Sequence, residues 1–200
     1  MQALDRVLRE ADDYFMGRSR LHEAARQLAA TLEREGIPYA IAGALALAAH
    51  GRVRLTEDVD VLLTREGLAA FKRAWLGRGY VEIGPGLKSV RDTAHDVRID
   101  FLLSGDFPGD GKPKPVVFPV PSGEAEALTP DGFRVLDLKT LVELKLASGM
   151  TAPHRAQDLA DVLALVRARS LPRGYAEGLD PFVRAKFLEL WDQAQVADDY

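Results

Sequence analysis

The sequence predicts an α+β fold, in which a small mixed sheet is flanked by helices and followed by a helical C-terminal part. Short β-branched and apolar runs, such as residues 59–63 and 97–103, alternate with segments of helical periodicity. From residue 137 onward the pattern is helical alone. The 47% hydrophobic content is enough for a real core. We therefore expect a core with N-terminal helices at residues 1–136 and helices packed on it at residues 137–200.

Helices are predicted at the N-terminal end, over residues 4–14 and 21–35. In the second one, apolar residues recur at helical spacing: Leu21, Ala24, Ala25, Leu28 and Leu32. The run Gly36-Ile37-Pro38 ends it, because proline cannot continue a helix. A strand at 39–41 and a helix at 44–49 follow.

The middle of the chain is predicted to contain most of the strands. After the strand at 59–63, Thr64 is suited to cap a helix at 66–76, which Gly77 ends. A short strand is expected at 80–83. Residues 87–91 and 97–103 are expected to pair as a hairpin.

The remaining elements lie on either side of a loop rich in Gly and Pro at residues 105–115. Such a loop is either a lid that faces the substrate or a mobile segment, and the sequence does not separate the two. Strands are expected at 116–120 and 133–135, the second after the turn Thr129-Pro130-Asp131-Gly132. Helices are expected at 138–148, 155–169 and 181–195.

Composition narrows the class of protein. No apolar stretch approaches the roughly 20 residues of a membrane-spanning helix, and the first residues lack the blocks of a signal peptide. The chain has no cysteine, so we expect a cytoplasmic protein without contact to a membrane. Its net charge of −4 argues against wholesale coating of nucleic acid. Six acids in the last 25 residues account for that excess, so the remainder is neutral and compatible with a local basic groove.

Three carboxylates carry most of the functional information. Asp58 and Asp60 lie two residues apart on a predicted strand, so their side chains share one face. Two neighbouring carboxylates repel unless a cation or a proton lies between them, and Mg²⁺ is the usual cation for oxygen ligands. Asp100 lies on a second predicted strand, on the face that also carries Arg98 and Leu102. Asp96 is the alternative to Asp100 if the register differs by a few residues.

The segment before the carboxylate pair indicates a ligand. Gly43 lies between the predicted strand and the helix at 44–49, where a glycine allows the backbone to approach a bound group. The N-terminus of the helix offers free N–H groups to an anion. Strand, glycine, helix and paired Asp therefore suggest a phosphate-binding backbone beside a metal site. His50 is expected to be a residue of the helix end.

The chain resembles the nucleotidyltransferase superfamily with the DNA polymerase β-like fold on these residues: Gly43, Asp58, Asp60 and Asp100. Within it, the run Arg54-Leu55-Thr56-Glu57-Asp58-Val59-Asp60 resembles the AbiEii/AbiGii abortive-infection toxins of type IV toxin–antitoxin systems. A later Lys and an Arg…Asp helix, here Lys145 and Arg155 to Asp158, fit that branch. The resemblance covers about residues 37–167. Ala44 stands where the family usually has Ser or Gly.

The resemblance implies a role for each of these residues. Asp58 and Asp60 would hold Mg²⁺ or Mn²⁺, and Asp100 would be a further metal ligand or the base that deprotonates the acceptor hydroxyl. Nucleotide binding is implied for Gly43 and Ala44 through the backbone, and for Arg54, Thr56, Lys145 and Asp158 through side chains. Lys145 is also implied as a catalytic residue, together with the three acids.

Lys145 is also a candidate from its helical phase. It follows Leu138, Leu141 and Val142 on the apolar stripe of the predicted helix. A lysine directed inward requires an anion, either a triphosphate or a buried carboxylate such as Asp58, unless it extends to solvent from the edge of the stripe. Asp158 is a site candidate through the resemblance. Asp161 is expected to be an acid favoured only by the helix dipole.

We thus expect a Mg²⁺-dependent enzyme that moves a nucleoside monophosphate from an NTP to an acceptor. A toxin-type enzyme would act on tRNA or another macromolecule and would have a cognate antitoxin as partner. One alternative is a nucleotidyltransferase for a small antibiotic. A second is a degenerate, non-catalytic nucleotide-binding module, for which Ala44 is the supporting feature.

Overall fold

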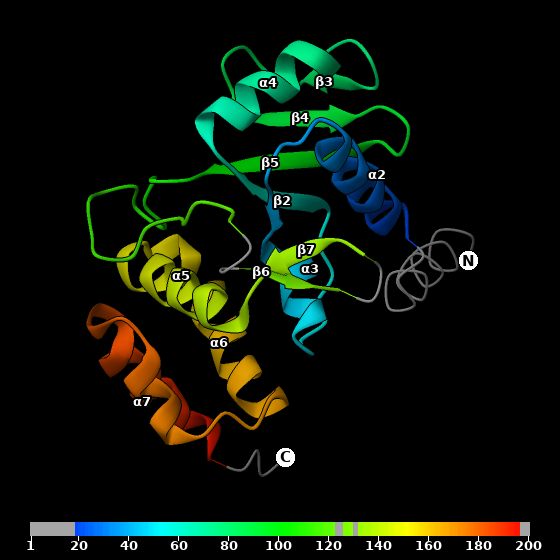
Figure 1. The fold of residues 1–200 in the computed structure, drawn as a ribbon. Helices are drawn as coiled ribbons and strands as arrows, with labels where there is room; N and C mark the ends of the chain where they lie inside the picture. Colours follow the sequence, from blue (N-terminus) through cyan, green and yellow to red (C-terminus); the bar gives the residue numbers. More distant parts are fainter. Residues whose placement is uncertain (1–18, 123–125, 130–131, 197–200) are drawn as a thin grey trace.

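The computed structural model of the chain describes residues 19–122, 126–129 and 132–196. The helix predicted at residues 4–14 lies outside this part. The described residues form one continuous sheet with helices on its faces and a group of helices beyond one end (Figure 1). None of the described helices is long and apolar enough to cross a membrane.

The sheet is mixed and has the strand order β3-β4-β5-β2-β1-β7-β6. The central pair β2–β5 is parallel, as is β1–β7, and the other neighbours are antiparallel. The strands are β1 (Ala40–Ile41), β2 (Asp58–Leu63), β3 (Tyr80–Glu82), β4 (Ser89–Asp92), β5 (Val97–Leu103), β6 (Glu126–Leu128) and β7 (Arg134–Leu136).

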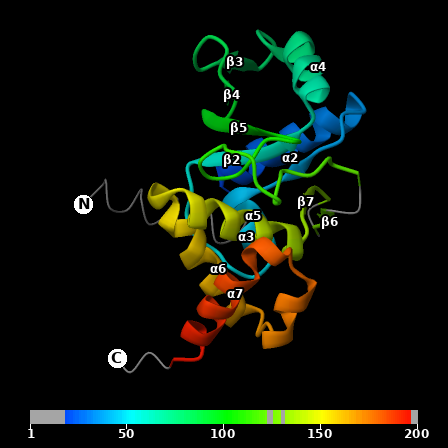
Figure 2. The same ribbon diagram turned by 90° about the vertical axis from the view of Figure 1, so that its left-hand side faces the viewer.

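The helices fall into two groups. Three of them pack on the sheet: α2 (Arg20–Arg34), α3 (Gly43–Ala49) and α4 (Arg65–Trp75). The others form a helical part beyond one end of the sheet, seen in both ribbon views (Figures 1 and 2). It contains α5 (Leu138–Thr151), α6 (Ala156–Ala168) and α7 (Pro181–Ala194), with 3₁₀ turns η1 (Pro153–Arg155) and η2 (Arg173–Gly178).

The two faces of the β2–β5 pair differ in chemistry. The odd-numbered positions, such as Val61 and Ile99, are fully buried on one face. That face is covered by α2 and α4, and the Phe71 ring of α4 contacts Phe101 with the ring centroids 5.4 Å apart. The other face carries the carboxylates of both strands. Alternation with period two therefore assigns the acids to the face that the covering helices leave open.

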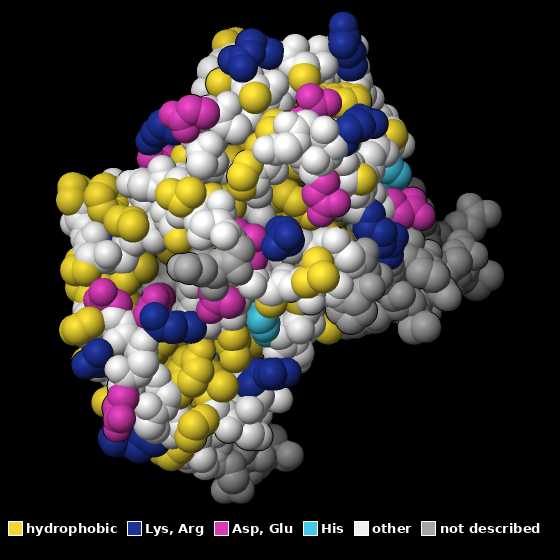
Figure 3. Space-filling model, in the orientation of Figure 1, with side chains coloured by type: hydrophobic (Ala, Val, Ile, Leu, Met, Phe, Trp, Pro, Cys, Tyr) yellow, Lys and Arg dark blue, Asp and Glu magenta, His cyan; other side chains and the backbone are white. Residues whose placement is uncertain are grey.

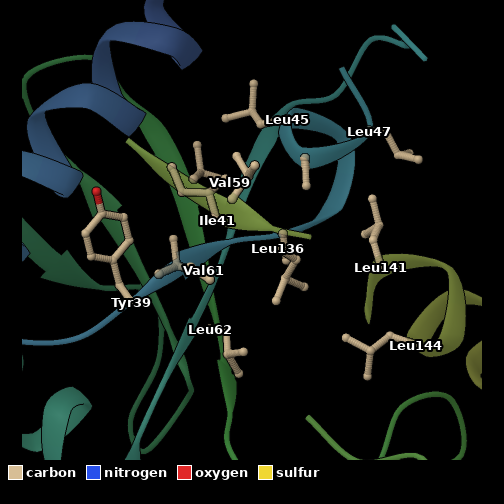
Figure 4. Close-up of a cluster of buried hydrophobic side chains, with 14 of the residues drawn as sticks. Tyr39, Ile41, Leu45, Leu47, Val59, Val61, Leu62, Leu136, Leu141 and Leu144 are labelled. Carbon is tan, nitrogen blue, oxygen red and sulfur yellow. The ribbon is translucent and has the colours of Figure 1, made fainter. Parts of the chain in front are cut away.

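The helical part is joined to the sheet by a continuous apolar core. Leu141 and Leu144 project from α5 toward the strands, where Leu136 and Leu62 lie (Figure 4). All four are buried. Burying such a side chain stabilises a fold by roughly 1.5–3 kcal/mol, so this contact holds α5 firmly beside the sheet.

Most of the predicted elements are confirmed, including the 97–103 strand, its hairpin partner and the three C-terminal helices. Thr64 caps α4 as expected, accepting a hydrogen bond from the Gly67 N–H at 3.0 Å. The strand predicted at 116–120 is wrong. Prolines at 115, 119 and 121 remove the N–H donors that a sheet ladder requires, and Phe118 bonds instead to Gly105 and Asp106. The short strand β6 was not predicted.

Candidate active site

A cavity of about 330 Å³ lies where the sheet, α5 and the start of α6 meet. One side is charged and contains Asp60, Lys145, Arg155 and Asp158, with His154 beside them. The other side is apolar and is formed by Leu102, Leu136, Leu141, Leu144, Phe107, Pro108 and Phe118. A cavity with an apolar wall and a few convergent charged groups is the usual form of a small-ligand site.

Gly43 lies directly against Asp60 at the edge of this cavity. Its φ is +57°, in the left-handed region that favours glycine. A Cβ at this position would lie 1.9 Å from Asp60 Oδ2, well inside van der Waals contact. The neighbouring Ala42 N–H donates to the Asp60 carbonyl at 2.8 Å. Only glycine therefore allows the backbone at the start of α3 to meet the Asp60 carboxylate.

The three predicted carboxylates lie on one face of β2 and β5. Asp60 is opposite Asp100 in the parallel register, and Asp58 is opposite Arg98. Of the three, only Asp60 lines the cavity. Asp100 accepts hydrogen bonds from Arg98 Nε at 2.9 Å and from the Ser89 hydroxyl. The acids predicted from the sequence are therefore neighbours, and the Asp100 carboxylate is already held by the Arg98 guanidinium and the Ser89 hydroxyl.

The carboxyl of Asp60 is hard to ionise where it stands. Burial raises its pKa to about 6, with further contributions from the negative charges of Asp58 and Asp100. The positive charges of Lys145 and Arg155 act in the opposite direction. A group in this environment gains from any cation placed beside it.

The alternative acid Asp96 is not part of the site. It lies in the turn between β4 and β5 with φ +55°, and its exposed carboxylate pairs with Arg91 at 2.7 Å. Ala44, Arg54 and Thr56 do not line the cavity either. Ala44 is buried behind Gly43, and the Thr56 hydroxyl donates to Asp58 Oδ1 at 2.5 Å.

Lys145 is buried and paired with two acids of α6. Its Nζ donates to Asp158 Oδ1 at 2.9 Å and to Asp161 Oδ2 at 2.8 Å, with 7% of the side chain exposed. The helical phase thus placed it correctly on the inner face of α5. The suggestion that Asp58 is its carboxylate partner is wrong. Asp158 and Asp161 are the anionic partners that the buried ammonium of Lys145 requires.

Asp161 is a site neighbour that the sequence interpretation missed. It is fully buried, and it also accepts from Arg54 Nε at 3.3 Å and from Gln157 Nε2 at 3.2 Å. Its assignment as an acid favoured only by the helix dipole is therefore wrong. The signal was its spacing with Val162 and Leu165, which puts Asp158 and Asp161 on the buried face of α6.

The surroundings of Asp158 keep it ionised. Burial raises its pKa, but the charge of Lys145, hydrogen bonds from Ser148 and Lys145, and the charge of Arg155 outweigh burial and hold it below its usual range. Arg155 Nε donates to Asp158 Oδ2 at 2.9 Å. The pKa values of Asp158 and Asp60 are therefore shifted in opposite directions, although both side chains line one cavity.

The loop at 105–118 forms part of the apolar wall of the cavity, through Phe107, Pro108 and Phe118. Gly109, with φ +76°, lies so close to α5 that a Cβ would be 2.4 Å from Thr151 Oγ1. Lys114 Nζ fixes the loop from within, donating to the Pro108 carbonyl and to Asp110 Oδ1, each at 2.6 Å. Of the two readings of this loop, the structure supports the one that faces the cavity. Phe107 gave no helical or strand signal that could have marked it, and Phe118 was assigned to the strand expected at 116–120 rather than to the site.

The carboxylates of the site are suitable ligands for a divalent metal, but they do not form a ready-made metal-binding cluster. Within the described residues, no group of three or more His, Cys, Asp or Glu side chains is arranged to hold a metal ion. Asp58 and Asp60 share a face and supply the oxygen ligands that Mg²⁺ and Mn²⁺ prefer. The third carboxylate, Asp100, is engaged by Arg98.

No family model matches the sequence, and no curated protein matches it. The structure is similar to the crystal structure of ANT(2")-Ia in complex with adenylyl-2"-tobramycin. The TM-score is 0.54 at 16% sequence identity, over 84% of this chain and 97% of that one. The chain has the nucleotidyltransferase fold. The α+β, polymerase β-like prediction is thereby confirmed.

Two further solved structures resemble the nucleotidyltransferase fold of this chain at lower TM-scores. A solution structure of ANT(2")-Ia matches with TM-score 0.41 and 16% identity, over 86% of this chain and 80% of that one. A candidate nucleotidyltransferase of Thermotoga maritima matches with TM-score 0.47 and 17% identity, over 71% and 91% of the two chains.

Proposed function

We propose that this protein transfers a nucleoside monophosphate from an NTP to an acceptor hydroxyl, with release of pyrophosphate. The observation that carries the proposal is the contact of the Gly43 backbone with Asp60, at the edge of a cavity that also contains Lys145 and Asp158. It brings a backbone open to phosphate oxygens next to a carboxylate that gains from a cation. The fold shared with ANT(2")-Ia supports the same reaction class.

Asp58 and Asp60 are the residues we propose to hold Mg²⁺ or Mn²⁺. When bound, such an ion supplies neutralisation of phosphate charge and alignment of the phosphate that is attacked. Asp100 is proposed as a further ligand or as the base for the acceptor hydroxyl. For either role its carboxylate must first exchange the Arg98 guanidinium for its new partner.

Lys145 is proposed to contribute positive charge to the nucleotide phosphates from the charged wall of the cavity. Its pairing with Asp158 and Asp161 keeps the ammonium in place in the absence of ligand. Arg155, next to it, adds a second cation at the same wall. Arg54 and Thr56 act one step further out, by holding Asp161 and Asp58.

For the acceptor, we favour tRNA or another macromolecule, with a cognate antitoxin as partner. The support is the resemblance of residues 54–60, Lys145 and Asp158 to the AbiEii-type toxins. A small antibiotic is the second candidate, and the observation in its favour is that ANT(2")-Ia was solved with adenylyl-2"-tobramycin.

The test is incubation of the protein with each labelled NTP, Mg²⁺, and either total tRNA or a panel of aminoglycosides, followed by mass analysis. Asp58→Asn and Asp60→Asn are the negative controls, and Asp96→Asn, in the exposed turn, is the matched positive control. The proposal would be supported if one acceptor gained the mass of one nucleotide with the wild type and with Asp96→Asn, but not with Asp58→Asn or Asp60→Asn. Transfer that persists in Asp60→Asn would refute the metal assignment.

A further inference from the structure

A second cavity, of about 660 Å³, lies on the other side of α6 from the candidate active site. It is lined by Gly51, Arg52, Val53, Ala160, Leu163, Ala164, Arg167 and Ala168. The small residues of α6 leave the space, and the arginines supply its polar groups. None of these described lining residues is acidic, although the chain as a whole carries more acids than bases.

Arg52 is the informative residue of this cavity. Its Nε is shielded from water and has no hydrogen-bond partner. Within the described part of the chain, the rest of its guanidinium makes no hydrogen bond or ion pair. Arg52 as a whole is only partly buried, but its Nε–H has lost water without gaining a partner. Such a loss is costly, and an anion at the guanidinium would offset it.

Arg169 and Arg167 extend the positive charge around Arg52. The Arg169 side chain lies over Gly51, where a Cβ would be 3.7 Å from Arg169 Cδ. Arg167 donates to the carbonyl oxygens of Ala194 and Val196, each at 3.2 Å, which fixes its side chain at the rim. Arg52 and Arg167 line the cavity and Arg169 lies next to it at Gly51, so the cavity carries the positive charge that phosphate oxygens require.

We propose that this cavity is a phosphate-binding subsite for the backbone of a polynucleotide acceptor, an inference that rests on the proposed transferase function. Opposite faces of α6 connect the two sites, because Asp158 and Asp161 point to Lys145 while Ala160 and Ala164 line the arginine cavity. A helix is about 10 Å wide, which corresponds to about three nucleotides of a strand. A polycationic antibiotic would gain nothing from this cavity.

The test measures binding of total tRNA in EDTA without nucleotide, so that a lack of transferase activity cannot affect the result. The variant is Arg52→Gln. The matched control is Arg73→Gln, an exposed arginine of α4 that removes the same charge far from the cavity. We expect Arg52→Gln to weaken binding about tenfold and to lower the slope of log affinity against log salt by about 1, with Arg73→Gln near the wild type. A thermal-unfolding measurement verifies that both variants fold.

Equal binding of tRNA by Arg52→Gln and Arg73→Gln would overturn the proposal. A second arm adds inorganic phosphate at constant ionic strength. Suppose that phosphate binds the wild type, that Arg52→Gln abolishes this binding, and that tRNA does not compete with phosphate. The site then binds free phosphate, and the acceptor assignment is wrong. Competition by tRNA that disappears in Arg52→Gln would support it.

Discussion

At the scale of single residues, Asp60 is the group whose charge state is most open to measurement. Its pKa of about 6 in the folded protein exceeds the ordinary value of 3.8. The folded protein therefore takes up a proton between pH 6 and pH 4 that the unfolded chain does not. Stability contributed by this group increases as the pH falls through 6, the reverse of the usual carboxylate behaviour.

We predict that Asp60→Asn increases the stability of the metal-free protein above pH 6 and flattens this part of the pH profile. Two pKa units correspond to at most about 3 kcal/mol, and solvent screening reduces the effect. Urea unfolding in EDTA from pH 4.5 to 8 measures it, with Asp96→Asn as the control. A profile of Asp60→Asn that runs parallel to the wild type would contradict the prediction.

Lys145 gives a prediction of the opposite sign. Its removal leaves Asp158 and Asp161 buried beside each other without their shared cation, a change that typically costs about 3–5 kcal/mol. We expect Lys145→Ala and Lys145→Met to lose stability by this order in urea unfolding, and both to bind NTP more weakly. The double variant Lys145→Met with Asp161→Asn should recover part of the loss. If Met alone restores both properties, Lys145 acts only by packing.

For Lys145, the sequence predicted the face of the helix on which the side chain lies, but not its partners or its effect on stability. Helical spacing identified an inward lysine, and an inward lysine without a known partner is expected to destabilise the protein. The structure reverses that sign, because two carboxylates of another helix meet the ammonium. Asp158 and Asp161 follow Lys145 by 13 and 16 positions and lie on a different helix. Their contact depends on how the two helices cross, and periodicity within one helix does not encode that.

At the scale of elements, the loop from Gly105 to Phe118 is the one whose role depends on how closely it docks on α5. Gly109 and Gly111 both have φ above +70°, so a Cβ is strained at either position. At Gly109 the Cβ would also meet Thr151 and the Ser148 carbonyl, whereas at Gly111 nothing lies within 4 Å. The pair separates backbone strain from docking.

We predict that Gly109→Ala lifts the loop from α5, opens the apolar wall and raises the KM for NTP or acceptor. Gly111→Ala should show only the strain of the left-handed residue, about 1 kcal/mol. Steady-state kinetics and thermal unfolding of the two variants provide the comparison. Identical KM values in both would mean that loop docking does not shape the cavity.

This loop also marks the limit of prediction at this scale. The glycines and prolines at 105–115 predicted a loop correctly, but the strand expected after it, at 116–120, does not form. The residues at 115, 119 and 121 are all prolines, and the apolar residues between them were given too much weight. By contrast, the bounds of the strand at 97–103 were predicted correctly. Its sequence alternates between apolar and polar residues, and the burial of every second residue in the structure follows the same alternation.

At the scale of the whole molecule, ligand linkage separates an active transferase from a degenerate module. We predict that Mg²⁺ with one of ATP, GTP, CTP or UTP raises the melting temperature more than either component alone. A ligand that binds only the folded form stabilises it by about 2.7 kcal/mol at a hundredfold excess over its Kd. Absence of a shift with all four nucleotides would favour the non-catalytic alternative.

Acids and bases are interspersed on the face shown in Figure 3, with hydrophobic side chains gathered in several places between them. The overall α+β class followed from the order of the elements alone. The cavity itself did not, since part of its apolar wall comes from a loop, and Lys145, Arg155 and Asp158 of its charged side lie 40 or more residues after Asp100 in the chain.

The distance along the chain between the acids and their counter-charges has a consequence for synthesis. During translation Asp58, Asp60 and Asp100 emerge first, and domains begin to fold from the N-terminal side. Lys145 and Arg155, which lower the pKa of Asp60, follow later. A nascent chain that ends before α5 holds Asp60 without these two cations and lacks the charged residues that α5 and α6 contribute to the cavity. The enzyme is therefore expected to gain nucleotide binding only once its helical part has left the ribosome.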